Sequence, residues 1–368
     1  MSHLQELQRL LSPYLKLSSA RLECLCHMII GLLAVNNVNL TKISKTFCSK
    51  TLAASSYKRT QRFLKGLKWD FAWLWKLIES CFSFKDDLHL ALDRTNWKFG
   101  KRNINILTLA VCYRGIGVPF LWLMLNKQGN SHWQERYQLL EKLVKLISPE
   151  RIAAILGDRE FVGQKWLQAM LSMDLPFVMR TRENICIANA KGIMLPASVL
   201  FRGVKAGRFI VLPTKRKVMG CELYVLVARL PTHELLILLT DRQPELAFDR
   251  YKLRWNIETL FSALKKRGFN FENTHLVHEE RISNLLFVMT IALIMGLRQG
   301  EFLEAQKPTK LKKHGYVAVA IFKRGLEHLG RLIFNVSINL KTLCQAILRI
   351  FKPVMSSGYQ LSNSRSVL

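Results

Sequence analysis

The 368-residue sequence predicts an α/β protein, with a mixed sheet interrupted by a β-rich insertion and flanked by an N-terminal and a C-terminal helical region. Three patterns predict this architecture. Apolar residues recur at helical spacing near both ends of the chain, and residues 87–182 alternate between strand and helix patterns. Residues 183–245 hold only short apolar runs between Gly-, Pro- and Lys-rich turns.

Changes between these patterns set the expected domain boundaries. We expect a helical region at 1–85, a sheet core in two parts at 86–182 and 246–300, the insertion at 183–245, a basic helical region at 301–354 and a disordered tail at 355–368.

The charge balance predicts a polyanionic partner. The chain has 55 Lys and Arg against 26 Asp and Glu, a net charge of +29. Nucleic acid is the commonest partner of so basic a protein, and an anionic membrane is the rival. The two longest apolar runs, 25–35 and 285–297, are shorter than the roughly 20 residues that a spanning helix needs, so we interpret them as buried helices and expect no membrane partner.

Cysteine usage and the first residues indicate a compartment. The eight cysteines are scattered without metal-ligand spacing, which favours buried free thiols in a reducing cytoplasm over a zinc site. The chain begins without a secretory signal pattern. We therefore expect a cytoplasmic protein that associates with the nucleoid when it binds DNA.

The N-terminal helical region has an unmixed basic stretch. Between Glu23 and Asp70 there is no acidic residue, but there are eight basic ones: Lys42, Lys45, Lys50, Lys58, Arg59, Arg62, Lys65 and Lys68. A solvated helix face usually mixes both signs of charge. We therefore predict that residues 42–68 bind the DNA backbone, with Arg59 and Arg62 among the phosphate contacts.

The sheet core is predicted element by element. Alternation gives a strand at 88–93, two apolar strands follow at 104–113 and 118–125, and Asn130-Ser131 is expected to cap a helix that ends at Ile147. A short buried strand at 152–156, a helix at 163–173 and a strand at 177–180 complete this part. After the insertion, one long helix is expected from about Leu246 to Lys266.

Three acidic residues are placed together by this order. Asp93 ends the first strand and Asp158 follows the fourth, so a sheet with these strands adjacent brings the two aspartates side by side. The long helix adds Glu258. Carboxylates without nearby His or Cys select Mg²⁺ or Mn²⁺, and two such ions roughly 3.5–4 Å apart catalyse phosphoryl displacement.

The cations of the long helix share a face with Glu258. At about 100° per residue, Tyr251, Arg254, Glu258 and Lys265 fall on one stripe. This predicts that Arg254 and Lys265 hold phosphates that the carboxylates alone would repel. A simpler interpretation is surface pairing of Arg254 with Glu258.

These residues resemble the insertion-sequence-four family of bacterial DDE transposases. The helix matches the family signature Tyr-x2-Arg-x3-Glu-x6-Lys, the segment 92–97 resembles its first aspartate motif, and 157–161 its second. The resemblance runs from about residue 88 to 273 and implies a ribonuclease-H-like core.

The resemblance implies a function and a set of roles. Asp93, Asp158 and Glu258 would be the metal ligands, and Tyr251, Arg254 and Lys265 would hold phosphate. A homodimer would bind the terminal inverted repeats of a bacterial insertion sequence, cut them and join them to target DNA. Some members hold a flipped base with an insertion tryptophan; residues 183–245 contain no Trp, which leaves this task to an aromatic such as Tyr224 or puts a hairpin step in doubt.

Several alternatives stay open at this point. The chain could be a catalytically inactive or domesticated DNA-binding relative, or a ribonuclease-H-like nuclease without strand transfer. Glu160 could replace Asp158 as a ligand. Arg159 could contact phosphate or pair with Glu160, and Trp97 could be a core residue or a base-stacking one.

Overall fold

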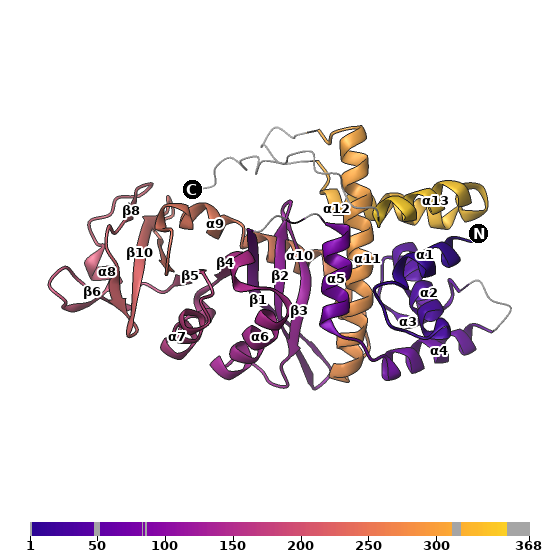
Figure 1. The fold of residues 1–368 in the computed structure, drawn as a ribbon, viewed down its shortest axis with the longest axis horizontal. Helices are drawn as coiled ribbons and strands as arrows, with labels where there is room; N and C mark the ends of the chain where they lie inside the picture. Colours follow the sequence, from indigo (N-terminus) through magenta and orange to yellow (C-terminus); the bar gives the residue numbers. More distant parts are fainter. Residues whose placement is uncertain (1, 48–51, 83, 85–86, 311–317, 352–368) are drawn as a thin grey trace. The chain divides into compact units, whose positions relative to one another are not determined.

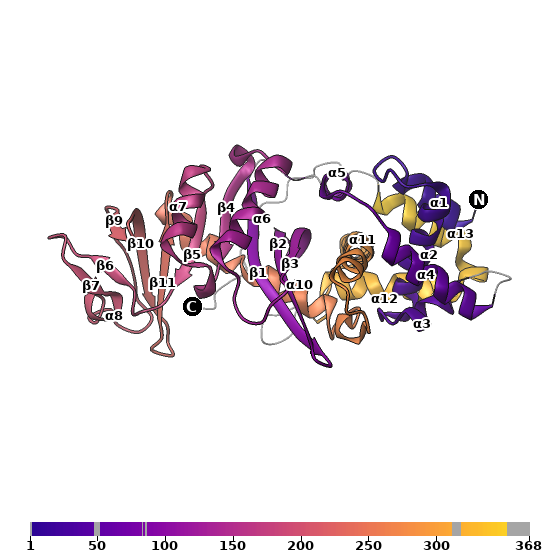
Figure 2. The same ribbon diagram turned by 90° about the horizontal axis from the view of Figure 1, so that it is seen from below.

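The computed structural model describes residues 2–47, 52–82, 84, 87–310 and 318–351, so the predicted tail at 355–368 lies outside the described residues. The chain forms two compact units. Unit 1 comprises residues 1–83, 96–104 and 260–357, and unit 2 comprises 84–95, 105–259 and 358–368. Figures 1 and 2 show the elements in two orthogonal views.

The sheet has the strand order β3-β2-β1-β4-β5-β11-β10-β9-β6-β7, with β8 paired to β10. Its core strands are β1 (Leu88–Phe99), β2 (Arg102–Tyr113), β3 (Ile116–Met124), β4 (Ile152–Gly157) and β5 (Phe177–Thr181). β4 is parallel to both β1 and β5, whereas β2 and β3 are antiparallel to each other. This order and direction are those of a ribonuclease-H-like sheet, so the predicted fold class is confirmed.

The insertion continues the core sheet. Its strands are β6 (Cys186–Ala188), β7 (Met194–Pro196), β8 (Phe209–Val211), β9 (Arg216–Val218), β10 (Cys221–Arg229) and β11 (Leu235–Thr240), with a short helix α8 (Ala197–Leu200). All of its strand pairs are antiparallel, as predicted. Because β11 pairs with β5, the insertion is an extension of the sheet. Buried Leu156, Val178, Leu226 and Leu238 share one apolar cluster across this junction.

Helices α6 (Trp133–Leu146) and α7 (Gln164–Ser172) and the 3-10 turns η1 (Pro149–Arg151) and η2 (Arg159–Phe161) connect the core strands. The predicted cap of α6 is wrong by one residue, because His132 is the N-cap and Glu135 completes a capping box. The predicted cap residues have other partners. Ser131 accepts a hydrogen bond from the Arg136 Nε at 2.8 Å, and Asn130 accepts one from Arg94 at 3.1 Å.

The single long helix predicted from Leu246 to Lys266 is also wrong. The segment forms η3 (Pro244–Leu246), α9 (Ala247–Lys252) and α10 (Trp255–Leu264), with a tight turn between α9 and α10. The Leu253 carbonyl accepts hydrogen bonds from the Asn256 side chain at 2.6 Å and the Cys112 Sγ at 3.3 Å. Such a side-chain amide competes with the helical backbone, which explains the break.

Unit 1 is helical. It contains α1 (His3–Leu11), α2 (Ser19–Val35), α3 (Leu40–Ser44), α4 (Ala53–Gly66), α5 (Phe71–Cys81), η4 (Phe271–Asn273), α11 (Glu279–Gln306), α12 (Ile321–Phe334) and α13 (Val336–Ile350). α11 packs against α2, α4, α5, α12 and α13. By length and composition it is apolar enough to span a membrane, but 83% of its most apolar window is buried inside the protein. It is the core helix of this unit.

The α11–α12 contact is close enough to need glycine. A Cβ added at Gly325 on α12 would lie 1.9 Å from the Gly296 carbonyl oxygen and 2.4 Å from the Gly300 nitrogen, both on α11. Since these are backbone atoms, the contact leaves no room for a side chain.

Candidate active site

Asp93 and Asp158 lie on adjacent parallel strands. β1 and β4 are in register, with Leu92 opposite Gly157, so the residues that follow each are neighbours at one edge of the sheet. This confirms the predicted adjacency of the first and fourth strands. Asp93 does not end its strand, however, because β1 continues to Phe99. Asp158 follows Gly157, the last residue of β4, and it caps the 3-10 turn η2.

Gly157 keeps the edge beside Asp158 compact. A Cβ on Gly157 would lie 2.5 Å from the Met179 sulfur and 3.2 Å from the Phe161 Cβ. The glycine therefore allows β5 and the η2 turn to close directly around Asp158.

The two aspartates differ in surroundings. The Asp93 carboxylate accepts the Arg94 backbone N–H at 2.7 Å, and the Asp158 carboxylate accepts the Arg159 N–H at 2.8 Å and the Tyr251 hydroxyl at 3.4 Å. Burial raises the pKa of Asp93 to about 6, and Glu160 and Asp158 add to this, against the Arg94 N–H and Arg254. Burial also raises the pKa of Tyr251, to about 12. The charged form of Asp93 is thus disfavoured, mainly because the carboxylate is buried.

Arg254 stands between Asp93 and Glu258. Its Nη2 donates to Glu258 Oε1 at 2.5 Å, and its Nη1 is 3.7 Å from Asp93 Oδ2. The Arg254 side chain is 10% exposed and its guanidinium lies 5.7 Å from the centre of the Tyr251 ring. Burial alone lowers the pKa of Arg254, but Tyr251, Asp158 and Glu258 outweigh this and raise it. One guanidinium therefore joins the acid of β1 to the acid of α10.

The carboxylates are not gathered around one point. Across the described ranges, no three His, Cys, Asp or Glu side chains are close enough together to hold a metal ion. The oxygen-only donor set fits a hard divalent cation. In this arrangement Glu258 pairs with Arg254, so Glu258 would have to change partner to join the two aspartates around an ion.

Glu160 and Arg159 have partners that the sequence did not indicate. Arg94 binds Glu160 through two hydrogen bonds of 3.2 Å, so the Glu160 carboxylate is engaged and the pairing of Arg159 with Glu160 is wrong. Arg159 instead donates to Glu234 at 2.6 Å, and Arg180 donates to the same oxygen at 2.5 Å. The partners are 54 or more residues apart in the sequence, so no local pattern could have indicated them.

Lys265 follows the last residue of α10 and belongs to unit 1. Its Nζ donates to the Asn96 carbonyl at 3.3 Å, pairs with Glu272 at 2.8 Å and lies 5.5 Å from the centre of the Trp97 ring. Trp97 is 8% exposed and packs on Phe271, which makes it a core residue. The predicted phosphate contact of Lys265 stays a prediction.

The two arginines of the N-terminal region face different surroundings. Arg59 pairs with Glu23 of α2 at 3.2 Å and donates to the Ala20 carbonyl. Arg62 is exposed on α4, on the same face as Lys58 and Lys65. Trp255, at the start of α10 and next to Arg254 in the sequence, is 64% exposed. The sequence did not indicate this exposure.

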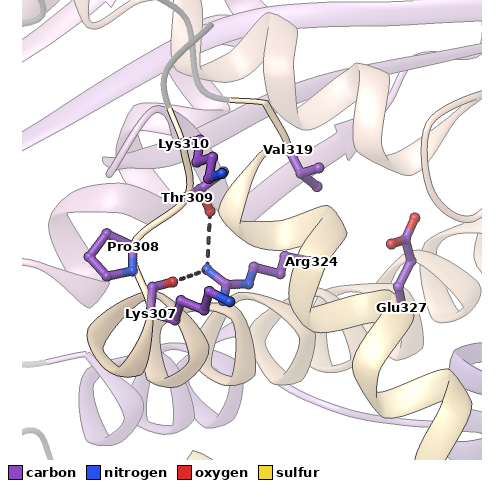
Figure 3. Close-up of a pocket in the computed structure, with 7 residues that line it drawn as sticks. All are labelled: Lys307, Pro308, Thr309, Lys310, Val319, Arg324 and Glu327. Carbon is purple, nitrogen blue, oxygen red and sulfur yellow. Dashed lines mark hydrogen bonds between the residues drawn. The ribbon is translucent and has the colours of Figure 1, made fainter.

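A cavity of about 260 Å³ lies in unit 1 between residues 307–310 and α12 (Figure 3). Arg324 is one of its charged wall residues, and Figure 3 shows its guanidinium directed at Thr309 and the Lys307 carbonyl. The same guanidinium pairs with Glu304 at 2.7 Å. Its charge is therefore already engaged within the protein.

Comparison with known proteins identifies the chain's family. The family model described as a transposase DDE domain matches residues 84–295, more than half of the chain. No curated protein matches. A cryo-EM structure of a piggyBac transposase synaptic complex with hairpin DNA is similar at 13% identity, covering 94% of this chain and 80% of that chain with a TM-score of 0.45. The chain belongs to the DDE transposase family, whose members are enzymes of metal-dependent DNA cleavage and transfer.

Proposed function

We propose that this DDE transposase mobilises a bacterial insertion sequence of the insertion-sequence-four type, by binding the element ends and catalysing strand cleavage followed by strand transfer. The supporting observation is the register of β1 and β4, in which Leu92 opposite Gly157 sets Asp93 beside Asp158. Arg254, with Glu258 in contact, reaches this same edge.

We further propose that Asp93, Asp158 and Glu258 hold two Mg²⁺ or Mn²⁺ ions. Such ions polarise the scissile phosphate and lower the pKa of an attacking water. The donor set supports this, because all three groups are carboxylates. Arg254, which donates to Glu258, would have to release this carboxylate for it to bind an ion.

Arg254 then has two successive partners. Before binding, it offsets the charge of Asp93 and Glu258. With these carboxylates holding a cation, the Arg254 guanidinium would bind a phosphate through two parallel hydrogen bonds. The Tyr251 hydroxyl, which donates to Asp158, orients this carboxylate from the other side.

The DNA partners and the assembly are part of the same proposal. The exposed basic face of α4 supports backbone binding at the terminal inverted repeats. A homodimer would bring two ends together in one synaptic complex. The net charge of +29 favours a location on the nucleoid, in the cytoplasm.

A plasmid assay tests this function. The protein, Mg²⁺ and a plasmid that carries the element's own ends should give nicked and joined products. Glu258→Gln should abolish both while end binding in EDTA is retained, because it removes a metal ligand and no DNA contact. Glu245→Gln removes an exposed glutamate of η3 and should cut normally.

The products separate the alternatives. Nicks without joined products would indicate a nuclease. DNA binding without nicks would indicate an inactive relative. Cleavage by Glu258→Gln at the wild-type rate would end the three-carboxylate proposal.

A further inference from the structure

Three charged side chains meet beside Asp158. Glu234 Oε1 accepts hydrogen bonds from Arg159 Nη2 at 2.6 Å and from Arg180 Nη2 at 2.5 Å. A single carboxylate oxygen therefore serves two guanidinium groups. The Arg180 Nε lies 4.0 Å from Asp158 Oδ1, which places this group directly at the candidate active site.

The turn that carries Glu234 has a fixed shape. It joins β10 to β11, and the Leu230 N–H donates to the Glu234 carbonyl at 2.9 Å. His233 adopts a left-handed backbone with φ of 66°, and its carbonyl accepts from Arg229 at 3.1 Å. Because Ile237 of β11 pairs with Thr181, the turn lies at the carboxyl end of β5. This is the edge at which Asp158 follows β4.

The two arginines are incompletely satisfied by this acid. Arg180 is 15% exposed, and its Nε is buried with no hydrogen-bond partner among the residues that the structure describes. The two guanidinium groups share a single oxygen of Glu234, and the Asp158 carboxylate that Arg180 also faces lies 4.0 Å away, beyond hydrogen-bond distance. A phosphate group offers more acceptor oxygens than Glu234 supplies here, and a fork of guanidinium donors matches its geometry.

The contact is also easy to exchange. Glu234 is 43% exposed and Arg159 is 44% exposed, so water and salt screen their attraction. Nothing buried has to open for the carboxylate to leave. A DNA backbone carries one negative charge on each of many neighbouring phosphates, so it competes effectively with such a pair.

We propose that Arg159 and Arg180 form a phosphate-binding pair for the DNA strand that enters beside Asp158, and that Glu234 occupies this pair as a phosphate substitute until DNA displaces it. This inference rests on the proposed function, since it requires DNA at this edge. It gives the insertion a definite role, because the β10–β11 turn sets how readily the edge accepts a backbone phosphate.

The test is DNA affinity in the absence of catalysis. Binding of a fluorescently labelled random-sequence duplex is measured in EDTA over a series of salt concentrations. Glu234→Gln should bind about tenfold more tightly than the wild type, because DNA no longer displaces a charged competitor. Glu222→Gln is the matched control, since it removes the same charge from an exposed position on β10.

Variants of the two arginines complete a double-mutant cycle with Glu234→Gln. Arg159→Met with Arg180→Met should weaken binding, reduce the salt slope by about 0.9 per lost phosphate contact, and abolish the gain from Glu234→Gln. Arg159→Met alone gives the same direction with a smaller effect, and its exposure makes it safe for folding. Thermal unfolding of each variant confirms that the chain is folded.

The outcomes are distinct. If Glu234→Gln and Glu222→Gln bind DNA equally well while wild-type protein binds and cuts, the phosphate-substitute role is wrong and the proposed function stands. If the gain from Glu234→Gln persists without both arginines, the role is also wrong. If the wild-type chain neither binds nor cuts DNA, both proposals fall.

Discussion

Removing the charge of Arg254 should separate metal binding from catalysis. This guanidinium joins Asp93 and Glu258, and its side chain is 10% exposed. Arg254→Met would leave both carboxylates without their cation. Breaking a fully buried pair costs about 3–5 kcal/mol, but Glu258 is 35% exposed, so we discount this to about 2 kcal/mol.

The loss is measurable as a shift in thermal unfolding. For a unit of this size, about 2 kcal/mol lowers Tm by roughly 4–8 °C in EDTA. Lys252→Met is the matched control, because Lys252 lies on α9 and forms an exposed pair with Asp249. It should change Tm little.

Mg²⁺ should reduce the difference in Tm between the wild type and Arg254→Met. The wild type has to break the Arg254–Glu258 contact before Glu258 can bind an ion, whereas the variant does not. Mg²⁺ should therefore raise Tm more in Arg254→Met than in the wild type; a hundredfold excess over Kd contributes about 2.7 kcal/mol. Cleavage should nevertheless be lost, since the variant lacks the guanidinium that would bind the phosphate between Asp93 and Glu258. An equal Mg²⁺ shift in both proteins would refute the exchange of partners.

Three shorter predictions concern unit 1. Gly325→Ala should destabilise the chain by about 3 kcal/mol or more, because the nearest backbone atom would lie 1.9 Å from the new Cβ. Gly330→Ala, whose Cβ would lie 3.2 Å from its nearest atom, should be tolerated. Similar denaturation midpoints for the two variants would contradict the close α11–α12 contact. Asn284→Ala should cost about 2–4 kcal/mol, since its side chain bonds Leu64, Leu67 and Trp69; a loss below about 0.5 kcal/mol by urea unfolding would argue against this role. Arg62→Ala should reduce the salt slope of DNA binding by about 1. Arg59→Ala should leave the slope unchanged, because the Arg59 side chain pairs with Glu23. Equal slopes for the two variants would mean that both arginines, or neither, contact the DNA backbone.

Short-range patterns in the sequence were enough to place the aspartates. Alternation at residues 88–93 and the apolar run at 152–156 predict two strands, and the β1–β4 pairing places Asp93 and Asp158 as expected. The length of β1 was not predictable. Residues 94–99 extend this strand through a hairpin with β2, and their largely polar sequence does not indicate a strand. Strand ends depend on such partners more than on local composition.

Long-range polar contacts were not predictable. The helical pattern around Tyr251 and Glu258 is unbroken in the sequence, but Cys112, far away on β2, helps to occupy the Leu253 carbonyl where the helix breaks. In the same way, the Arg159–Glu234 contact joins a motif to a turn 75 residues later. Periodicity carries no information about partners at such separations.

The buried Asp93 carboxylate should make the protein less stable at neutral pH when no metal ion is added. Burial first, and then Glu160 and Asp158, raise the pKa of Asp93 to about 6 from its usual 3.8. Since the folded state holds this proton more tightly than the unfolded state, its contribution to stability is present at low pH and is lost as pH rises from about 4 to 6.

Asp93→Asn removes this loss. A shift of about two pH units corresponds to roughly 3 kcal/mol. In EDTA the variant should therefore be more stable than the wild type by up to about 3 kcal/mol at pH 7.5, and the difference should vanish near pH 4. Asp249→Asn, at a side chain that is 79% exposed, is the control and should show no such pH dependence. A wild-type protein as stable as Asp93→Asn at pH 7.5 would mean that Arg254 already compensates the buried charge. A gain confined to neutral pH would mean that the protein gives up stability to keep an ionised carboxylate ready for a cation.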